Sequence, residues 1–85
     1  MPLTSIVIKN LSFDCTASKL DEMFSFYGDV NRVTVPVDVS GRNRGFGFVE
    51  MLHQHEAETA IHELDGCEMT GRILSVSRAR PRRGP

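Results

Sequence analysis

Residues 44–51 read Arg-Gly-Phe-Gly-Phe-Val-Glu-Met, and this stretch decides which fold the rest of the chain must complete. Side chains alternate between the two faces of a strand, so Phe46 and Phe48 would share one face. Gly47 and Val49 would lie on the other face, and their small or aliphatic side chains suit burial. Two phenylalanines would then meet solvent. This pattern indicates a surface on which unpaired nucleobases stack, while the neighbouring arginine meets phosphate.

The residues before this stretch predict a strand, a helix and a second strand. Residues 5–10 are a β-branched run typical of a short strand. Four apolar residues then repeat at i, i+3, i+4 and i+7, as in a buried helical stripe: Leu20, Met23, Phe24 and Tyr27. Thr16 or Ser18 is available to cap this helix, and Gly28 stands where a C′ glycine would end it. Residues 30–37 alternate with three valines on one face, and their proline suits either a strand at a sheet edge or the frayed end of a strand.

The residues after the stretch predict a second helix and a last strand. The helix would bury Ala57, Ala60, Ile61 and Leu64. Residues 72–78 would form the strand, with Leu74 and Val76 inward and Ile73, Ser75 and Ser77 outward. The order is βαββαβ, which predicts an α+β, ferredoxin-like sandwich with two helices on one face of a four-stranded antiparallel sheet. A register slipped by one residue would bury the phenylalanines and expose the aliphatic residues that the helices need.

Length and composition indicate one small domain. The chain has 85 residues, of which 40% are hydrophobic and 25% charged, as is ordinary for a globular fold. No apolar run approaches membrane-spanning length and no signal peptide opens the chain, so neither a membrane nor secretion is expected. Cys15 and Cys67 have neither CxxC nor zinc-ligand spacing. They are interpreted as free thiols in a reducing compartment, the nucleus or cytoplasm, with a single disulfide left open. We expect a monomer, and the chain could be a fragment of a longer protein.

Charge is distributed unevenly along the chain, although the net charge is only −1. Residues 1–77 carry six basic and eleven acidic side chains, a balance of −5, whereas residues 78–85 carry four arginines and no acid. The acids concentrate in the two predicted helices, and the bases on predicted strands, in the loop before residue 44 and in the tail. One face of the domain should therefore be acidic and the opposite face basic. The arginine-rich tail either binds directly or serves as a solubilising end.

Over roughly residues 5–79 the chain resembles an RNA recognition motif (RRM) domain. The longer signature of that family is a basic residue followed by Gly-aromatic-Gly/Ala-aromatic-aliphatic-x-aromatic, and it aligns with residues 44–51 without a gap. The shorter signature aligns with residues 6–11, Ile-Val-Ile-Lys-Asn-Leu. A signature of eight residues in its correct place in the βαββαβ order is specific. The resemblance implies one domain over residues 1–79, followed by a basic tail over 80–85.

The resemblance also implies that the open face of the sheet binds single-stranded RNA. Phe46 and Phe48 would stack on bases or pack against sugars, and Arg44 would reach a phosphate. The loop before them and the end of the last strand commonly contact RNA in the family. Lys9 lies on the same strand face as Val7. It is interpreted either as an RNA contact or as an ordinary solvated lysine. The candidate RNA-binding residues are Phe46, Phe48, Arg44, Val7, Lys9, Arg42, Ser77, Arg78 and Arg80.

Two positions depart from the family pattern. Val7 stands where the shorter signature normally has an aromatic residue. Because stacking contributes about 1–3 kcal/mol per base, losing one ring should weaken binding by about ten- to a hundredfold. Met51 stands where the family usually has an inward aromatic residue, and methionine fills such a gap with little penalty. We therefore expect modest affinity, with the arginine tail compensating.

Two other functions stay open. A protein-interaction module on the same scaffold would use the acidic first helix and an Arg-x-Phe near the last strand, but residues 72–74 read Arg-Ile-Leu. Phe26 falls off the helical stripe and should be exposed, where it could anchor a protein partner on the helical face. Single-stranded DNA is the second competitor, because stacking ignores the sugar and only contacts to the 2′-hydroxyl distinguish RNA.

The sequence offers no catalytic, cofactor or metal site. His53, His55 and His62 have no cysteine cluster nearby and no carboxylate pair with ligand spacing, so they are interpreted as surface histidines. The Gly-Phe-Gly of residues 45–47 lacks the third glycine of a nucleotide-binding loop. No Ser/His/Asp or Cys/His arrangement has a credible placement, so we expect a binding protein and not an enzyme.

Overall fold

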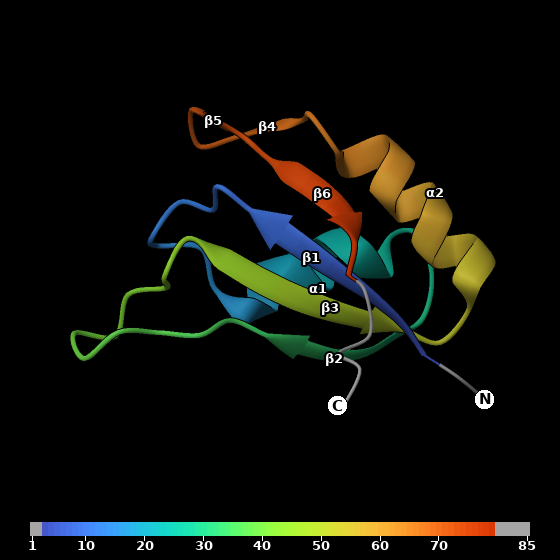
Figure 1. Cartoon of the computed structure of the whole chain (residues 1–85), viewed down its shortest axis with the longest axis horizontal. Coiled ribbons are helices and arrows are strands. Elements are labelled where there is room, and N and C mark those ends of the chain that lie inside the picture. Colours follow the sequence, from blue (N-terminus) through green and yellow to red (C-terminus); the bar gives the residue numbers. More distant parts are fainter. Residues whose placement is uncertain (1–2, 80–85) are drawn as a thin grey trace, which may run out of the picture.

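The computed structural model describes residues 3–79, and its element order confirms the predicted ferredoxin-like fold. Two helices cover one face of an antiparallel sheet with the strand order β2-β3-β1-β6 (Figure 1). The sheet strands are β1 (Thr4–Lys9), β2 (Val30–Thr34), β3 (Phe46–Met51) and β6 (Ser75–Arg78). The remaining elements are α1 (Ala17–Ser25), α2 (Gln54–Leu64) and a small hairpin of β4 (Glu68–Met69) and β5 (Arg72–Ile73). Neither helix in residues 3–79 has the length and apolar character needed to cross a membrane.

The hydrophobic core lies between the helices and the sheet. In β3, Gly47, Val49 and Met51 are buried, whereas Phe46 is half-buried and Phe48 is exposed on the other face. This alternation confirms the register predicted from the sequence. The buried apolar residues of the described chain are Ile6, Ile8, Leu11, Cys15, Leu20, Phe24, Val49, Met51, Ala57, Ala60, Leu64, Leu74 and Val76.

Both cysteines are free thiols. Cys15 is buried just before α1, and Cys67 is half-buried after α2. Burial raises the pKa of the Cys15 thiol, the charge of Asp14 raises it further, and Lys19 opposes the shift. The two thiols are not joined, which settles the disulfide alternative in favour of free cysteines.

Helix α1 begins as predicted and ends differently. Thr16 is its N-cap, and the Thr16 hydroxyl accepts a hydrogen bond from the Lys19 N–H at 3.1 Å. The helix ends at Ser25, three residues before Gly28, and Gly28 is not among the residues with positive φ. The prediction of a left-handed C′ glycine is therefore wrong. A Cβ at Gly28 would overlap the side chain of Glu56, so this glycine lets α2 approach the connection between α1 and β2.

The last strand is shorter than the predicted strand over residues 72–78. Strand β6 pairs with β1 only over Ile6–Lys9. β1 ends there, because the chain turns at Asn10, where φ is +66°. Residues before Ser75 consequently have no partner in the main sheet. Arg72 and Ile73 pair with β4 instead, which makes the prediction of one continuous strand wrong.

Strand β2 lies at the sheet edge, as its proline predicted, and it ends at Thr34. Val37 lies beyond this end, forms an isolated bridge to Asn43 and is 58% exposed. The predicted alternation therefore does not continue as far as Val37, because the strand that would set it has already ended at Thr34.

Candidate nucleic-acid interface

Antiparallel pairing aligns the side chains of the open face in rows across the strands. In one row, Phe48 lies between Thr34 of β2 and Val7 of β1, and Val7 is paired in turn with Ser77 of β6. The neighbouring row holds Phe46, Lys9 and Ser75. Predicted site residues on three strands, β1, β3 and β6, are thus brought onto one surface, which is turned toward the viewer in Figure 1.

The two phenylalanine rings on β3 contact each other edge to face. Their centroids are 5.7 Å apart and their planes meet at 81°. Phe48 is the more exposed ring, and Phe46 is half-buried beside Lys9. A flat base parallel to one ring is nearly perpendicular to the other. The pair can therefore stack one base on one ring while the second ring packs against a sugar or the edge of a base.

A carboxylate limits the open face at the end of β3. Glu50 faces outward, is half-buried, and pairs with Arg32 of β2 and Ser5 of β1. Its Oε1 accepts a hydrogen bond from Asn31 Nδ2 at 3.3 Å. A negative charge here disfavours a phosphate close to Glu50, although Arg32 lies beside it in the same row. Strand alternation alone places Glu50 on the same face of β3 as Phe46 and Phe48.

The loop between β2 and β3 holds Arg42 above a third exposed ring. The Arg42 guanidinium carbon lies 5.6 Å from the ring centroid of Phe13, which is 59% exposed in the connection from β1 to α1. A cation over an aromatic face at this distance is attracted to it. Sequence reasoning missed Phe13, because a loop residue belongs to no periodic pattern.

Two polar side chains give this loop a defined conformation. The Asp38 carboxylate accepts hydrogen bonds from the Ser40 hydroxyl at 2.7 Å, the Ser40 N–H at 2.9 Å and the Arg42 N–H at 3.2 Å. These bonds, led by the one from the Ser40 hydroxyl, lower the pKa of Asp38 below its ordinary value. Asn43 is buried and donates to the Cys15 carbonyl at 2.9 Å. Arg42 and Arg44 therefore extend from an organised loop.

The structure does not bring every predicted contact to the phenylalanines. Arg78 pairs with Ile6 in register, so its side chain leaves β6 on the helical side. There the Arg78 guanidinium lies 3.8 Å from the Glu58 carboxylate of α2. Ser77 does face the open side, and Arg80 lies outside the described residues.

A groove of about 630 Å³ lies on the other side of β6, away from the phenylalanines. It is lined by Glu58, Ile61, His62, Asp65, Val76, Ser77 and Arg78. The groove and the open face share Ser77 at the edge of β6, and most of the predicted RNA-binding residues lie on the open face.

Comparison with known proteins gives consistent matches across most of the chain. The family described as RNA recognition motif matches residues 6–75. A protein named for RNA binding, RbpB of Nostoc sp., is 52% identical over 79 residues, which cover 92% of this chain and 77% of that protein. The crystal structure of the RNA-binding protein PG1 superimposes with a TM-score of 0.88 at 38% identity, covering 95% of this chain and 99% of PG1. The Sxl-lethal protein in complex with RNA gives a TM-score of 0.88 at 28% identity, covering 96% of this chain and half of the other.

Proposed function

The chain belongs to the RNA recognition motif family, and we propose that it binds single-stranded RNA across the open face of its sheet. The observation that carries this proposal is the position of Phe46 and Phe48. Both lie on the face of β3 opposite the helices, in rows that continue over β1 and β6. A surface of this kind has no packing role within the described chain. It matches what an unpaired base requires, namely a ring to stack on and polar groups around it.

The arrangement of charges supports one direction for the bound strand. A base stacks on Phe48, the half-buried Phe46 meets a sugar, and the phosphates lie toward Arg44 and Arg42, away from Glu50. Val7 supplies no second ring in the same row, so the isolated open face binds with modest affinity. Thr34 and Ser77 end this row with hydroxyl groups, which can bond a ribose 2′-hydroxyl.

The first experiment replaces both phenylalanines of β3 with alanine. Each stacked or packed base contributes about 1–3 kcal/mol, so Phe46→Ala with Phe48→Ala should abolish measurable binding to short RNA oligomers in a fluorescence anisotropy titration. Circular dichroism should stay native, because neither ring belongs to the core. Phe26→Ala is the matched control, since Phe26 is 81% exposed on the helical side and its loss should leave affinity unchanged. Retained affinity in the double variant would place the RNA site elsewhere.

RNA and DNA are distinguished by the same assay with matched oligomers. If the hydroxyls at the ends of the Phe48 row contact the ribose, RNA should bind more tightly than DNA of the same sequence, and Thr34→Val with Ser77→Ala should reduce the difference. Equal affinities would favour binding through bases and phosphates alone.

The alternative of a protein-interaction module is less well supported. Residue 74 is leucine in place of the phenylalanine of the Arg-x-Phe motif, and Arg72 is engaged within the domain. Its Nη2 donates to Asn10 Oδ1 at 2.8 Å and its Nε to the Asn10 carbonyl at 3.2 Å. Amide chemical-shift mapping with RNA oligomers decides between the classes, since shifts should fall on β1 and β3 and not on the helices. We further propose that the chain acts as a binding protein, without catalysis, in a reducing compartment that keeps Cys15 and Cys67 free.

A further inference from the structure

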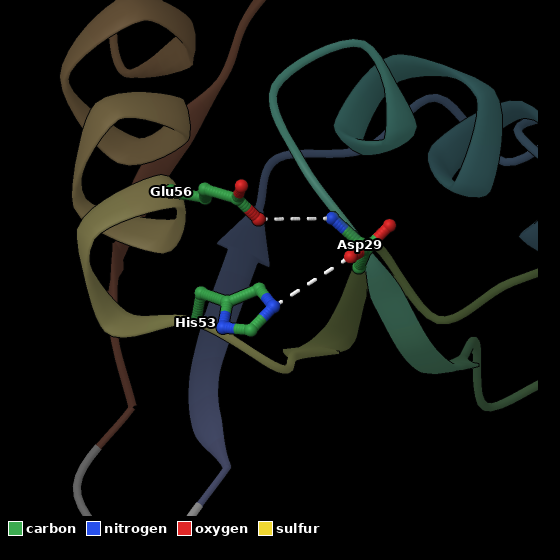
Figure 2. Close-up of side chains that lie close together, drawn as sticks. All are labelled: Asp29, His53 and Glu56. Carbon is green, nitrogen blue, oxygen red and sulfur yellow. Dashed lines mark hydrogen bonds and ion pairs between the residues drawn. The ribbon is translucent and has the colours of Figure 1, made fainter.

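Three side chains from separate segments meet at the end of the sheet where β2 begins and β3 ends (Figure 2). Asp29 ends the connection from α1, His53 directly precedes α2, and Glu56 lies in the first turn of α2. One nitrogen or oxygen of each side chain lies within 4.8 Å of those of the other two. We propose that Asp29, His53 and Glu56 bind a divalent transition metal ion, and that Zn²⁺ fits this set of donors best.

The His53 side chain points to this cluster and does not cap the helix that it precedes. His53 is the N-cap of α2, but its side chain makes no capping hydrogen bond. Its Nε2 instead faces Asp29 Oδ2 at 3.6 Å, as Figure 2 shows. That distance is longer than a hydrogen bond, which requires about 2.7–3.2 Å. Two ligands that each lie about 2.0–2.2 Å from a tetrahedral Zn²⁺ are about 3.3–3.6 Å apart, so the observed spacing fits two ligands of one ion.

The Glu56 carboxylate is held in position by the backbone around it. Its Oε1 accepts a hydrogen bond from the Asp29 N–H at 3.1 Å, which leaves lone pairs on both oxygens for a cation. The side chain passes over Gly28 at a distance that a Cβ would prevent. The Leu52 N–H also donates to the Asp29 carbonyl, at 3.1 Å. The Glu56 carboxylate and the backbone of Asp29 are thus placed by contacts between α2, β3 and the α1–β2 connection, and the exposed Asp29 side chain can turn toward a bound ion.

The donor set determines which ion is expected. One imidazole nitrogen and two carboxylate oxygens match Zn²⁺, whereas Ca²⁺ and Mg²⁺ prefer oxygen ligands throughout. Asp29 and His53 are exposed, so water completes the coordination. The competing explanation is a plain ion pair between Asp29 and a protonated His53, with Glu56 serving only as a backbone acceptor. An ion pair binds no metal, so the two explanations give different results in a titration.

The test is a Zn²⁺ titration of the full chain without a histidine tag. Binding is monitored by isothermal titration calorimetry and by the NMR signals of the amides and histidine rings. One equivalent should bind, with shifts at residues 28–30 and 52–57 and a rise in melting temperature. Loss of an outer partner of a metal ligand typically costs about 10–100-fold in affinity, so His53→Gln, which removes a ligand, should cost at least about tenfold. His55→Gln and His62→Gln are the matched controls and should bind Zn²⁺ as the unaltered chain does.

A second variant separates coordination from local structure. Glu56→Gln keeps an oxygen that can accept the Asp29 N–H and removes only the carboxylate charge, so circular dichroism should stay native while Zn²⁺ affinity falls. The proposal is overturned if no saturable binding occurs, if His53→Gln binds as tightly as the unaltered chain, or if the shifts appear at Cys15 and Cys67. None of these measurements uses RNA, and so their failure would leave the proposed function untouched.

Discussion

Val7 lies at the centre of the open face, beside the ring that is most available for stacking. It pairs with Phe48 on one side and Ser77 on the other, and it is half-buried. Because residue 7 is valine, the row contains only one aromatic side chain, that of Phe48. The aromatic part of the open face therefore ends at β3, although the sheet continues over two more strands.

Substituting Val7→Tyr should widen this surface and tighten RNA binding. The gain expected from one more stacked base is about 1–3 kcal/mol, or about ten- to a hundredfold in the dissociation constant measured by fluorescence anisotropy. Val7→Ile adds volume without a ring and should change affinity little. If the tyrosine variant binds no better than the isoleucine variant, no base passes over this position.

Single residues differ in how far the sequence reveals their roles. The outward position of Phe46 and Phe48 follows from strand alternation, because one face of β3 must meet the helices. The same alternation places Arg78 inward with Val76, and its contact with Glu58 agrees with that placement. The meeting of Phe13 with Arg42 follows from no pattern, because it depends on the conformations of two loops.

At the level of the elements, β3 and α1 fit together through a glycine. A Cβ built on Gly47 would lie 3.0 Å from Leu20 Cδ1 of α1 and 3.3 Å from the Thr34 carbonyl oxygen of β2. The carbonyl belongs to backbone that is paired in the sheet and cannot move freely. The helix therefore packs closely on β3 only because this position carries no side chain.

Gly47→Ala should destabilise the fold through this overpacking. Inserting a methyl group into a well-packed core typically costs about 1–3 kcal/mol, measured here as a lower free energy of unfolding in urea. Ser75→Ala on the open face is the control, because exposed substitutions typically change stability by about 0.5 kcal/mol or less. An unchanged midpoint for the glycine variant would mean that α1 shifts without cost.

The number, type and order of the main elements were predictable, because each buries one apolar face with a regular period. One end each of α1, β2 and β6 was not. The start of β6 is set by where β1 ends, about 65 residues earlier in the chain, and the role of Gly28 is set by Glu56 on another helix. The cluster of Asp29 with His53 and Glu56 was likewise not predictable, because Asp29 lies far from the other two residues in the sequence. No local window of sequence contains both partners in any of these cases.

Across the whole molecule, the charges do not attract RNA by their sum. The net charge is −1, and the ion pairs of the helical side include Lys19 with Glu22 and Arg78 with Glu58. We therefore expect attraction to phosphate from the local arginines of the β2–β3 loop, with the arginine-rich tail predicted to add to it. Residues 80–85 lie outside the described residues, and their part in binding stays a prediction.

Replacing Arg80, Arg82 and Arg83 with serine should weaken binding to every RNA sequence by a similar factor. Each phosphate neutralised on a single strand contributes about −0.7 to the slope of log K against log salt, so losing three contacts should flatten the slope by up to about 2. Titrations at several salt concentrations measure this slope. A slope that stays the same would show that the tail makes no phosphate contact.

The strand order has a consequence for synthesis on the ribosome. β1 is the first strand to emerge, yet its two neighbours in the sheet are β3 and β6, and β6 is the last strand of the described chain. Ile6 and Ile8 of the nascent chain cannot be covered on both flanks until nearly all of the domain has left the exit tunnel. The sheet that would present Phe46 and Phe48 to RNA is thus completed only when β6 pairs with β1, and a product truncated before β6 would leave one edge of β1 unpaired.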